Sequence, residues 1–367
     1  MSTGDATAWL TTELPVLATA IDHTHQTHPT HTIRLSATLH AYFRTAGQWH
    51  YAHRIHRTAL TTATTTNDPR TQAAALYDVG VVSRRRGVLE AAVEAQTGAL
   101  KLFTAIGDLL GQGNTLTELG FLYRLRGDLE ASFDAQTRAL QLFIDSGDLL
   151  GQGDVLNDLG GVYRLRGDLE AAVEAHGRAL QLHTDTGSPL GQATTLHHLG
   201  IVYRLRGDLK AAVEAQTHAL QLDADSGSVH GEANAHLQIG IAHHLEREYG
   251  LATTDLTDAL HLFTQVADTD GQAETHNAFG NLALDHSDAG DPHTHFTTAL
   301  ALARECGTKL HEANALVGQA QCLRRAGNTP RAVTLLHQAL VIHHEIHAHE
   351  AAHTADLLRS LDSNNQS

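Results

Sequence analysis

Cysteine, aromatic residues and long apolar runs are scarce in this chain of 367 residues. Its two cysteines, Cys306 and Cys322, are too few for a disulfide framework, so we expect both to be reduced. Aromatic residues make up 5%, fewer than the strands of a β-propeller need, and no Trp-Asp dipeptide occurs. No apolar stretch reaches transmembrane length, and no basic segment followed by an apolar run opens the chain. A soluble cytoplasmic protein is therefore expected.

Positive charge is also in short supply. The chain has 25 Lys and Arg against 41 Asp and Glu, a formal net charge of −16. Binding to a phosphate backbone or to an anionic bilayer needs a basic footprint. We therefore expect a protein or peptide partner, with no direct nucleic-acid binding and no membrane binding.

A period of 40 residues is the dominant positive feature. An Ala-Leu pair recurs at this interval from Ala59-Leu60 to Ala339-Leu340. Two columns of glycines keep the same interval: Gly80, Gly120, Gly160, Gly200, Gly240 and Gly280 in one, and Gly47, Gly87, Gly127, Gly167, Gly207 and Gly327 in the other. A fixed period of this length is typical of a solenoid or a propeller, and the scarcity of aromatics favours the helical solenoid.

Each period predicts two helices. Leu116, Leu119 and Tyr123 are spaced i, i+3, i+7, the pattern of one buried helical face. Asp128 follows Gly127 as a good N-cap for a second helix, and Gly147 fits the end of that helix. Each unit is therefore predicted to be an antiparallel helix pair joined by a Gly-Asp turn.

The period divides the chain into three parts. Residues 1–28 are predicted to form an N-terminal capping helix, and residues 349–367 a C-terminal capping helix with a frayed tail. Residues 29–348 form eight 40-residue units. The first is irregular because His40 replaces the expected glycine, and the seventh because Asp285 to Asp291 interrupts its first helix.

The motifs resemble the tetratricopeptide repeat. Leu119-Gly120 and Tyr123 match that family's Leu-Gly and Tyr in the first helix, and Ala92, Ala172, Ala212 and Ala139 match its small residues in the second. The family's mid-helix aromatic is replaced by Gln96, Gln136, His176 and Gln216. These departures resemble the 40-residue subtype of Pins/LGN-type adaptors and of bacterial NB-ARC (STAND) regulators. The resemblance implies an all-α, right-handed solenoid that acts as a non-catalytic scaffold in bacterial signalling or transcriptional regulation.

By the same resemblance, one face of the first helices lines a concave groove for a partner protein or an extended peptide. The predicted groove residues are Arg84, Asn114, Thr117, Phe121, Arg124, Asn157, Arg164, His197, Ile201, Arg204 and His244. The arginines among them favour an acidic partner. Two other readings stay open: the arginines could simply complement helix C-termini, or they could recur because the repeats were copied, since Tyr123 to Glu130 and Tyr163 to Glu170 are identical.

Two alternative functions stay open. The chain could be a receptor for a signalling peptide, or the sensor portion of an NB-ARC-type regulator. The remote alternative is a zinc hydrolase, because His349, Glu350 and His353 form an HExxH pattern. A metalloprotease also needs a third ligand and a substrate cleft, whereas only 14 residues follow His353, and the continuation with Gly and His found in metzincins is absent. A chance match is also unsurprising, because the chain has 29 histidines. We therefore predict no catalytic site, no cofactor and no metal site.

Overall fold

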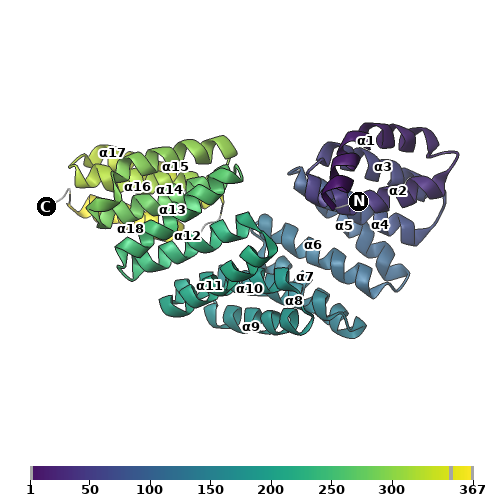
Figure 1. Ribbon diagram of the computed structural model, residues 1–367, viewed down its shortest axis with the longest axis horizontal. Coiled ribbons are helices and arrows are strands. Elements are labelled where there is room, and N and C mark those ends of the chain that lie inside the picture. Colours follow the sequence, from purple (N-terminus) through teal and green to yellow (C-terminus); the bar gives the residue numbers. More distant parts are fainter. Residues whose placement is uncertain (1–2, 347–349, 365–367) are drawn as a thin grey trace. The chain divides into compact units, whose positions relative to one another are not determined.

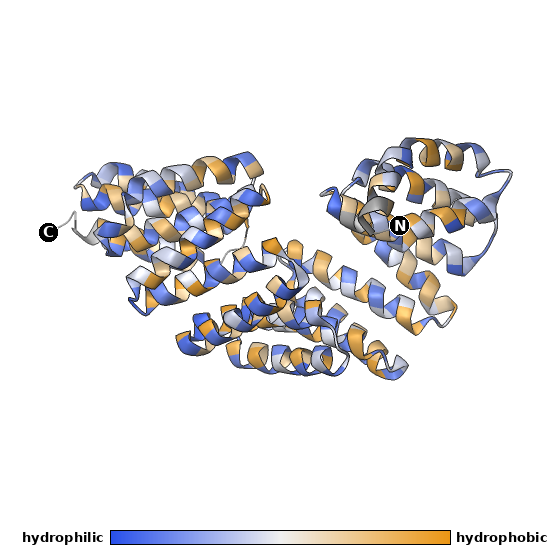
Figure 2. Ribbon diagram, in the orientation of Figure 1, coloured by the Kyte–Doolittle hydropathy of each residue, from blue (hydrophilic) through white to orange (hydrophobic). Residues whose placement is uncertain are grey.

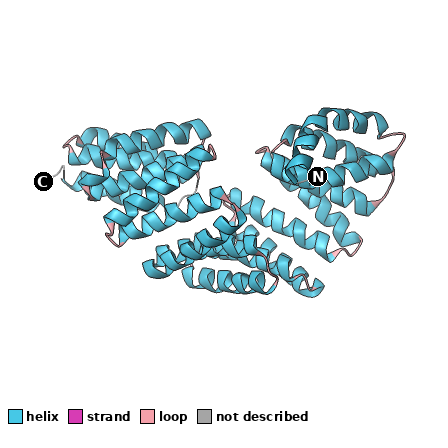
Figure 3. Cartoon of the chain, in the orientation of Figure 1, coloured by secondary structure: helices cyan, strands magenta, loops and turns pink. Residues whose placement is uncertain are grey.

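Helices make up nearly the whole structure, a computed structural model that describes residues 3–346 and 350–364 (Figures 1 and 3). Within these ranges there is no strand, and one short 3-10 helix, η1 (Ser287–Ala289), accompanies the α-helices. The α-helices are α1 (Thr3–Thr24), α2 (Pro29–Ala46), α3 (Trp49–Thr65), α4 (Pro69–Arg85), α5 (Leu89–Ala105), α6 (Leu109–Leu125), α7 (Leu129–Ser146), α8 (Leu149–Leu165), α9 (Leu169–Asp185), α10 (Pro189–Arg206), α11 (Leu209–Ser226), α12 (Val229–Leu245), α13 (Tyr249–Gln265), α14 (Thr269–Asp285), α15 (Pro292–Cys306), α16 (Lys309–Arg325), α17 (Thr329–Glu345) and α18 (Glu350–Asn364).

The helices form two compact units, and the boundary between them along the chain falls within α8. One unit runs to Val162 and the other starts at Tyr163. In each unit, consecutive helices pack against each other as pairs, such as α4 with α5 and α12 with α13. The first helix of a pair also contacts the first helix of the next pair, as α4 contacts α6, and as α10, α12, α14 and α16 follow one another. The predicted all-α solenoid of paired helices is confirmed. None of the described helices combines the length and apolar character needed to span a bilayer.

The core of each repeat comes from the predicted apolar face. Leu116 and Leu119 of α6 are buried, as are Ala139 and Phe143 of α7. Ala139 has no exposed surface, so its small side chain lets the paired helices approach closely. Every helix carries both apolar and polar residues along its length (Figure 2), as expected of a helix buried on one side.

The predicted turn and cap are also present. Gly127 has φ 78°, the left-handed conformation that glycine adopts without steric cost. The carboxylate of Asp128 then accepts a hydrogen bond at 3.0 Å from the backbone N–H of Ala131, in the first turn of α7. The chain therefore reverses within three residues, and the two helices of the pair lie side by side.

The glycines of the first helices make room for the glutamines that replace the family's aromatic residue in the second helices. A Cβ added at Gly120 would lie 2.7 Å from Nε2 of Gln136, so only glycine leaves room for this fully buried side chain. The Gln136 amide uses that room to donate to the backbone carbonyl of Thr117 at 3.3 Å. Gln96 and Gln216 donate in the same way to carbonyls one helix earlier. A buried amide therefore replaces the family's aromatic residue and ties the two helices of a repeat together.

The seventh repeat departs from this plan. After α14 the chain passes through η1, and Gly290 has φ 102°. Asp291 then caps α15 by accepting from the backbone N–H groups of His293 and Thr294. Phe296 fills the place that glutamine holds in earlier repeats and is fully buried.

Candidate functional site

In the first unit, the predicted groove residues lie on α4, α6 and α8, with Phe121 between two arginines. The guanidinium carbons of Arg84 and Arg124 each lie 4.7 Å from the centre of the Phe121 ring, a cation–π arrangement. Nε of Arg84 also donates to the carboxylate of Glu118 at 2.8 Å. These two arginines lie in the last turns of α4 and α6, as the helix-end interpretation expects, and both also contact an aromatic side chain.

The other predicted residues of this unit differ in exposure. Asn114 is exposed, whereas Thr117 and Asn157 are half-buried. The Thr117 hydroxyl donates to the Gly113 carbonyl at 3.0 Å, so its hydrogen is already used within its own helix.

Asp158 adds an acid to this face that the sequence analysis did not identify. Its carboxylate accepts from Nε2 of Gln136 at 3.2 Å. Burial, together with the neighbouring charges of Asp154 and Glu118, raises the pKa of Asp158 to about 6 against the opposing effect of Arg124. A carboxyl group with such a pKa is held in a poorly solvated place.

In the second unit, four predicted residues meet around a cavity of about 380 Å³. They are Arg164, Ile201, Arg204 and His244. The polar residues that line the cavity beside them were not predicted: Gln238, Glu274, Asn277, Asn281, His311, Asn314 and Glu350. The cavity belongs to the face built by the first helices of successive repeats, since α10, α12, α14 and α16 supply most of its wall.

The cavity wall offers polar atoms with unused hydrogen-bonding capacity. Nε of Arg204 is buried and has no hydrogen-bond partner among the described residues. The same is true of Oε1 of Gln238 and Oδ1 of Asn277, whose side chains are 8% and 6% exposed. The Asn277 amide is held in place because its Nδ2 donates to the His311 carbonyl at 3.1 Å. One cationic donor and two acceptors in the cavity wall are therefore left without a partner among the described residues, and each has almost no surface open to the cavity.

Charge in this cavity is balanced between Arg204 and Glu274. Burial raises the pKa of Glu274, while His311 and Arg204 act in the opposite direction. Burial likewise lowers the pKa of the Arg204 guanidinium, opposed by Glu274. The Glu274 side chain is still 37% exposed, which fits a carboxylate at the bottom of a concavity, open to solvent but with protein on most sides.

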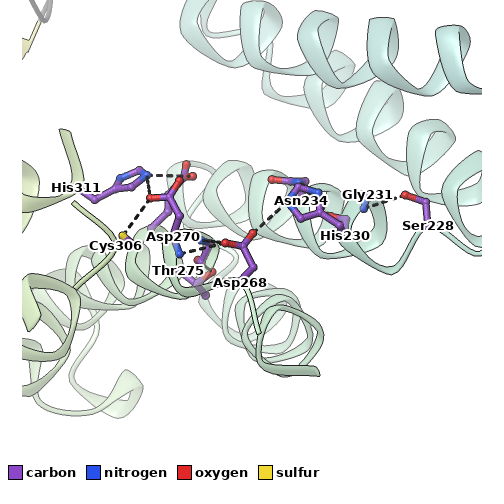
Figure 4. A network of polar contacts seen from close by, with 11 residues as sticks. Ser228, His230, Gly231, Asn234, Asp268, Asp270, Thr275, Cys306 and His311 are labelled. Atoms are coloured by element: carbon purple, nitrogen blue, oxygen red, sulfur yellow. Dashed lines mark hydrogen bonds and ion pairs between the residues drawn. The ribbon is translucent and has the colours of Figure 1, made fainter. Parts of the chain in front are cut away.

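A polar network joins the helices that build the wall (Figure 4). Nε2 of His311 in α16 lies 3.5 Å from the carboxylate of Asp270 in α14. Two residues earlier, Asp268 caps α14 and lies 3.0 Å from Nε2 of His230 in α12. These contacts connect three successive first helices near their N-termini, and His311 is the member of the network that also lines the cavity.

Two predicted histidines are already engaged. Both ring nitrogens of His197 are used, Nδ1 at 2.7 Å from Oε1 of Gln216 and Nε2 at 2.8 Å from Oδ2 of Asp223. His197 therefore orders the interior of its repeat. His244 lines the cavity, but its Nε2 also lies 3.1 Å from the carboxylate of Asp285.

The polar cavity residues that were not predicted occupy repeat positions that could have indicated them. Asn277 lies four periods after Thr117, Asn281 four periods after Phe121, and Asn314 five periods after Asn114. They belong to the same columns as the predicted groove residues. The same 40-residue spacing, continued into the last repeats, therefore indicates them.

The HExxH pattern is not placed as a set, because His349 lies outside the described residues. His353 is an exposed residue of α18.

Comparison with known proteins gives the repeats a family. The model of the tetratricopeptide repeat matches residues 71–145 and 152–225. These two stretches carry tetratricopeptide repeats. No curated protein matches the chain.

Solved structures with the same fold include several Rap proteins. The apo form of RapI is 15% identical, with a TM-score of 0.64 over 75% of this chain and 98% of RapI. The Rap conjugation gene regulator of plasmid pLS20, solved with its Phr* peptide, is 13% identical, with a TM-score of 0.63 over 91% and 95%. Aspartyl phosphate phosphatase F from Bacillus subtilis is 11% identical, with a TM-score of 0.62 over 78% and 75%. At these identities the likeness shows that the tetratricopeptide repeats of this chain share the fold of those proteins.

Proposed function

We propose that this protein is a non-catalytic scaffold that binds an extended peptide, or an extended segment of a partner protein, against the first helices of its second unit. The observation that carries the proposal is the cavity in which Arg204, Gln238 and Asn277 present polar atoms without partners among the described residues. Buried polar groups normally have partners, because each unsatisfied group costs about 1–3 kcal/mol. A ligand that supplies both donors and acceptors would satisfy all three once these side chains turn toward the cavity.

An extended peptide fits this chemistry. Its backbone N–H groups can donate to the carboxamide oxygens of Gln238 and Asn277, and a carboxylate can pair with Arg204. Ile201 and Ile241 line the same cavity and offer an apolar surface for a side chain of the peptide. An acidic peptide segment with one apolar anchor is therefore the partner we propose.

We further propose that the protein acts in regulation, as a receptor for a signalling peptide. The fold matches that of a Rap gene regulator, which was solved with a peptide, and this favours a receptor for a signalling peptide. The 40-residue period adds the resemblance to Pins/LGN-type adaptors and to NB-ARC regulators. One structure with this fold is named as an aspartyl phosphate phosphatase, so we propose the non-catalytic role on the cavity's residues and not on the fold alone.

The proposal can be tested with a peptide selected on the purified chain from a random library. We expect Arg204→Gln to weaken the binding of an acidic peptide by roughly 10-fold or more, since a charge-assisted hydrogen bond contributes about 1.5–3 kcal/mol. Asn281→Ala, an exposed change at the cavity, should also weaken binding. Fluorescence anisotropy measures both effects.

The matched control is Arg178→Gln, which removes an exposed arginine from the second helix of a repeat in the same unit. Its affinity should equal that of the unaltered chain. If Arg178→Gln weakens binding while Arg204→Gln does not, the peptide binds elsewhere and the proposal is wrong.

A further inference from the structure

The first repeat contains a histidine pair that no later repeat has. His40 occupies the position of Gly80, Gly120 and Gly200, and His56 occupies that of Gln96, Gln136 and Gln216. Both members of the Gly-Gln pair have therefore changed to histidine in the same repeat. A carboxylate completes the group, because Asp78 stands where Glu118 and Asp158 stand in the next two repeats.

The structure brings these three side chains together from α2, α3 and α4. Nδ1 of His40 lies 2.9 Å from Oδ1 of Asp78, and Nδ1 of His56 lies 3.4 Å from Oδ2 of the same carboxylate. One potential ligand atom from each residue lies within 4.8 Å of the others. Two atoms bound to a tetrahedral ion at about 2.1 Å are roughly 3.4 Å apart, so the group needs only a small contraction to enclose one.

We propose that His40, His56 and Asp78 form a binding site for a zinc-like divalent transition-metal ion. Two imidazole nitrogens and one carboxylate oxygen are ligands that Zn²⁺ favours, whereas Mg²⁺ and Ca²⁺ favour shells made of oxygen. A water molecule would complete a tetrahedral shell.

The burial of the three residues suits such an ion. His56 has no exposed surface, while the side chains of His40 and Asp78 are 23% and 16% exposed. The site is thus closed on one side and reached by solvent on the other, where an ion can enter.

Nδ1 of His56 lies 3.4 Å from the Asp78 carboxylate, and the Ser36 hydroxyl lies 2.8 Å from the same nitrogen. An ion bound at Nδ1 would therefore displace the Ser36 hydroxyl, whereas Nε2 has no partner among the described residues. The later repeats show that the position needs no ion for packing, since Gln136 simply donates to Asp158 there at 3.2 Å. The histidine pair is therefore an addition to the repeat plan, and its ion would fasten the first repeat to the second.

The test is calorimetric titration of Zn²⁺ into the full chain, freed of metal with a chelator. The key variant is His40→Gly with His56→Gln, which rebuilds the Gly120-Gln136 pair and should fold as the later repeats do. The control replaces His23, His28 and His31 with glutamine, because these nearby histidines could bind zinc adventitiously. We expect the unaltered chain and the control to share one zinc equivalent, whose affinity falls at least about 100-fold in the key variant. Zinc should also raise the melting temperature of the unaltered chain, but not that of the key variant.

Three results would overturn the site. The first is a key variant that keeps this zinc equivalent unchanged, and the second is an unaltered chain that binds no stoichiometric zinc. The third is Mg²⁺ binding at the site as tightly as zinc, because that would exclude the proposed metal class.

Discussion

Replacement of His176 by glutamine should change the pH dependence of stability in a way that the structure allows us to calculate. His176 of α9 is fully buried, and its ring stacks on that of His198 with the centroids 5.4 Å apart. Burial, together with the charges of His198 and Arg164, lowers the pKa of His176 from 6.5 to about 3. The folded protein therefore keeps this imidazole neutral down to a pH at which the unfolded chain has long since taken up a proton.

The sign and size of the effect follow from proton linkage. Because the folded pKa is the lower one, the unfolded chain binds more protons between pH 6.5 and 3, and stability is lost as the pH falls through that window. Each pH unit within the window costs about 1.4 kcal/mol. At about pH 5 the loss is therefore about 2 kcal/mol, and this figure hardly changes if the folded pKa is one unit higher.

Glutamine is the natural replacement, since Gln96, Gln136 and Gln216 hold the same position in other repeats. The free energy of unfolding in urea, followed by circular dichroism, should be measured for both proteins near pH 7.5 and near pH 5. We expect the variant to gain about 2 kcal/mol relative to the unaltered chain on moving to the lower pH. His218→Gln, an exposed change in α11, should show no such gain. A stability difference for His176→Gln that is the same at both pH values would refute the reasoning.

Two further predictions concern the repeat plan itself. Gly120→Ala should destabilise the chain by about 1–3 kcal/mol, because the new Cβ would lie 2.7 Å from Nε2 of Gln136. Gly161→Ala should stabilise it by about 0.5–1 kcal/mol, because no atom lies within 4 Å of the new Cβ. Urea unfolding of both variants measures these changes, and equal effects would contradict the prediction. Asp128→Ala should cost about 1 kcal/mol through loss of the cap on Ala131, and Asp208→Ala should cost less, because Asp208 makes no side-chain cap bond and pairs with Arg206 instead. Thermal melting compares them, and a larger loss for Asp208→Ala would be evidence against the capping argument.

The fold could be predicted from the sequence because the helices, turns and caps that build it depend on residues close together in the chain. The spacing of Leu116, Leu119 and Tyr123 needs only helical geometry, and the Gly127-Asp128 turn needs only a left-handed glycine followed by a capping carboxylate. The 40-residue period repeats these local signals in successive units, so the same helix pair is expected in each of them. The reason for Gln136 emerged only in the structure, where its amide fills the space left by Gly120.

The site was readable only in part. Arg204 and Ile201 could be placed at the cavity because they share columns with Arg124 and Phe121. The weak acid Glu274 could not be recognised, because its raised pKa depends on neighbours from other repeats that bury it. His40 could be recognised as an irregularity, but the grouping of His56 and Asp78 around it requires the packing of three helices.

The central claim is that the peptide lies on the first helices of the second unit. The most direct measurement is photo-crosslinking of a selected acidic peptide that keeps its carboxylate and carries a photoreactive group on the neighbouring residue, followed by mass spectrometry of the labelled chain. The account predicts labels in α10, α12, α14 and α16, near Arg204 and Asn281. Labels confined to the second helices α9, α11, α13 and α15 would contradict it.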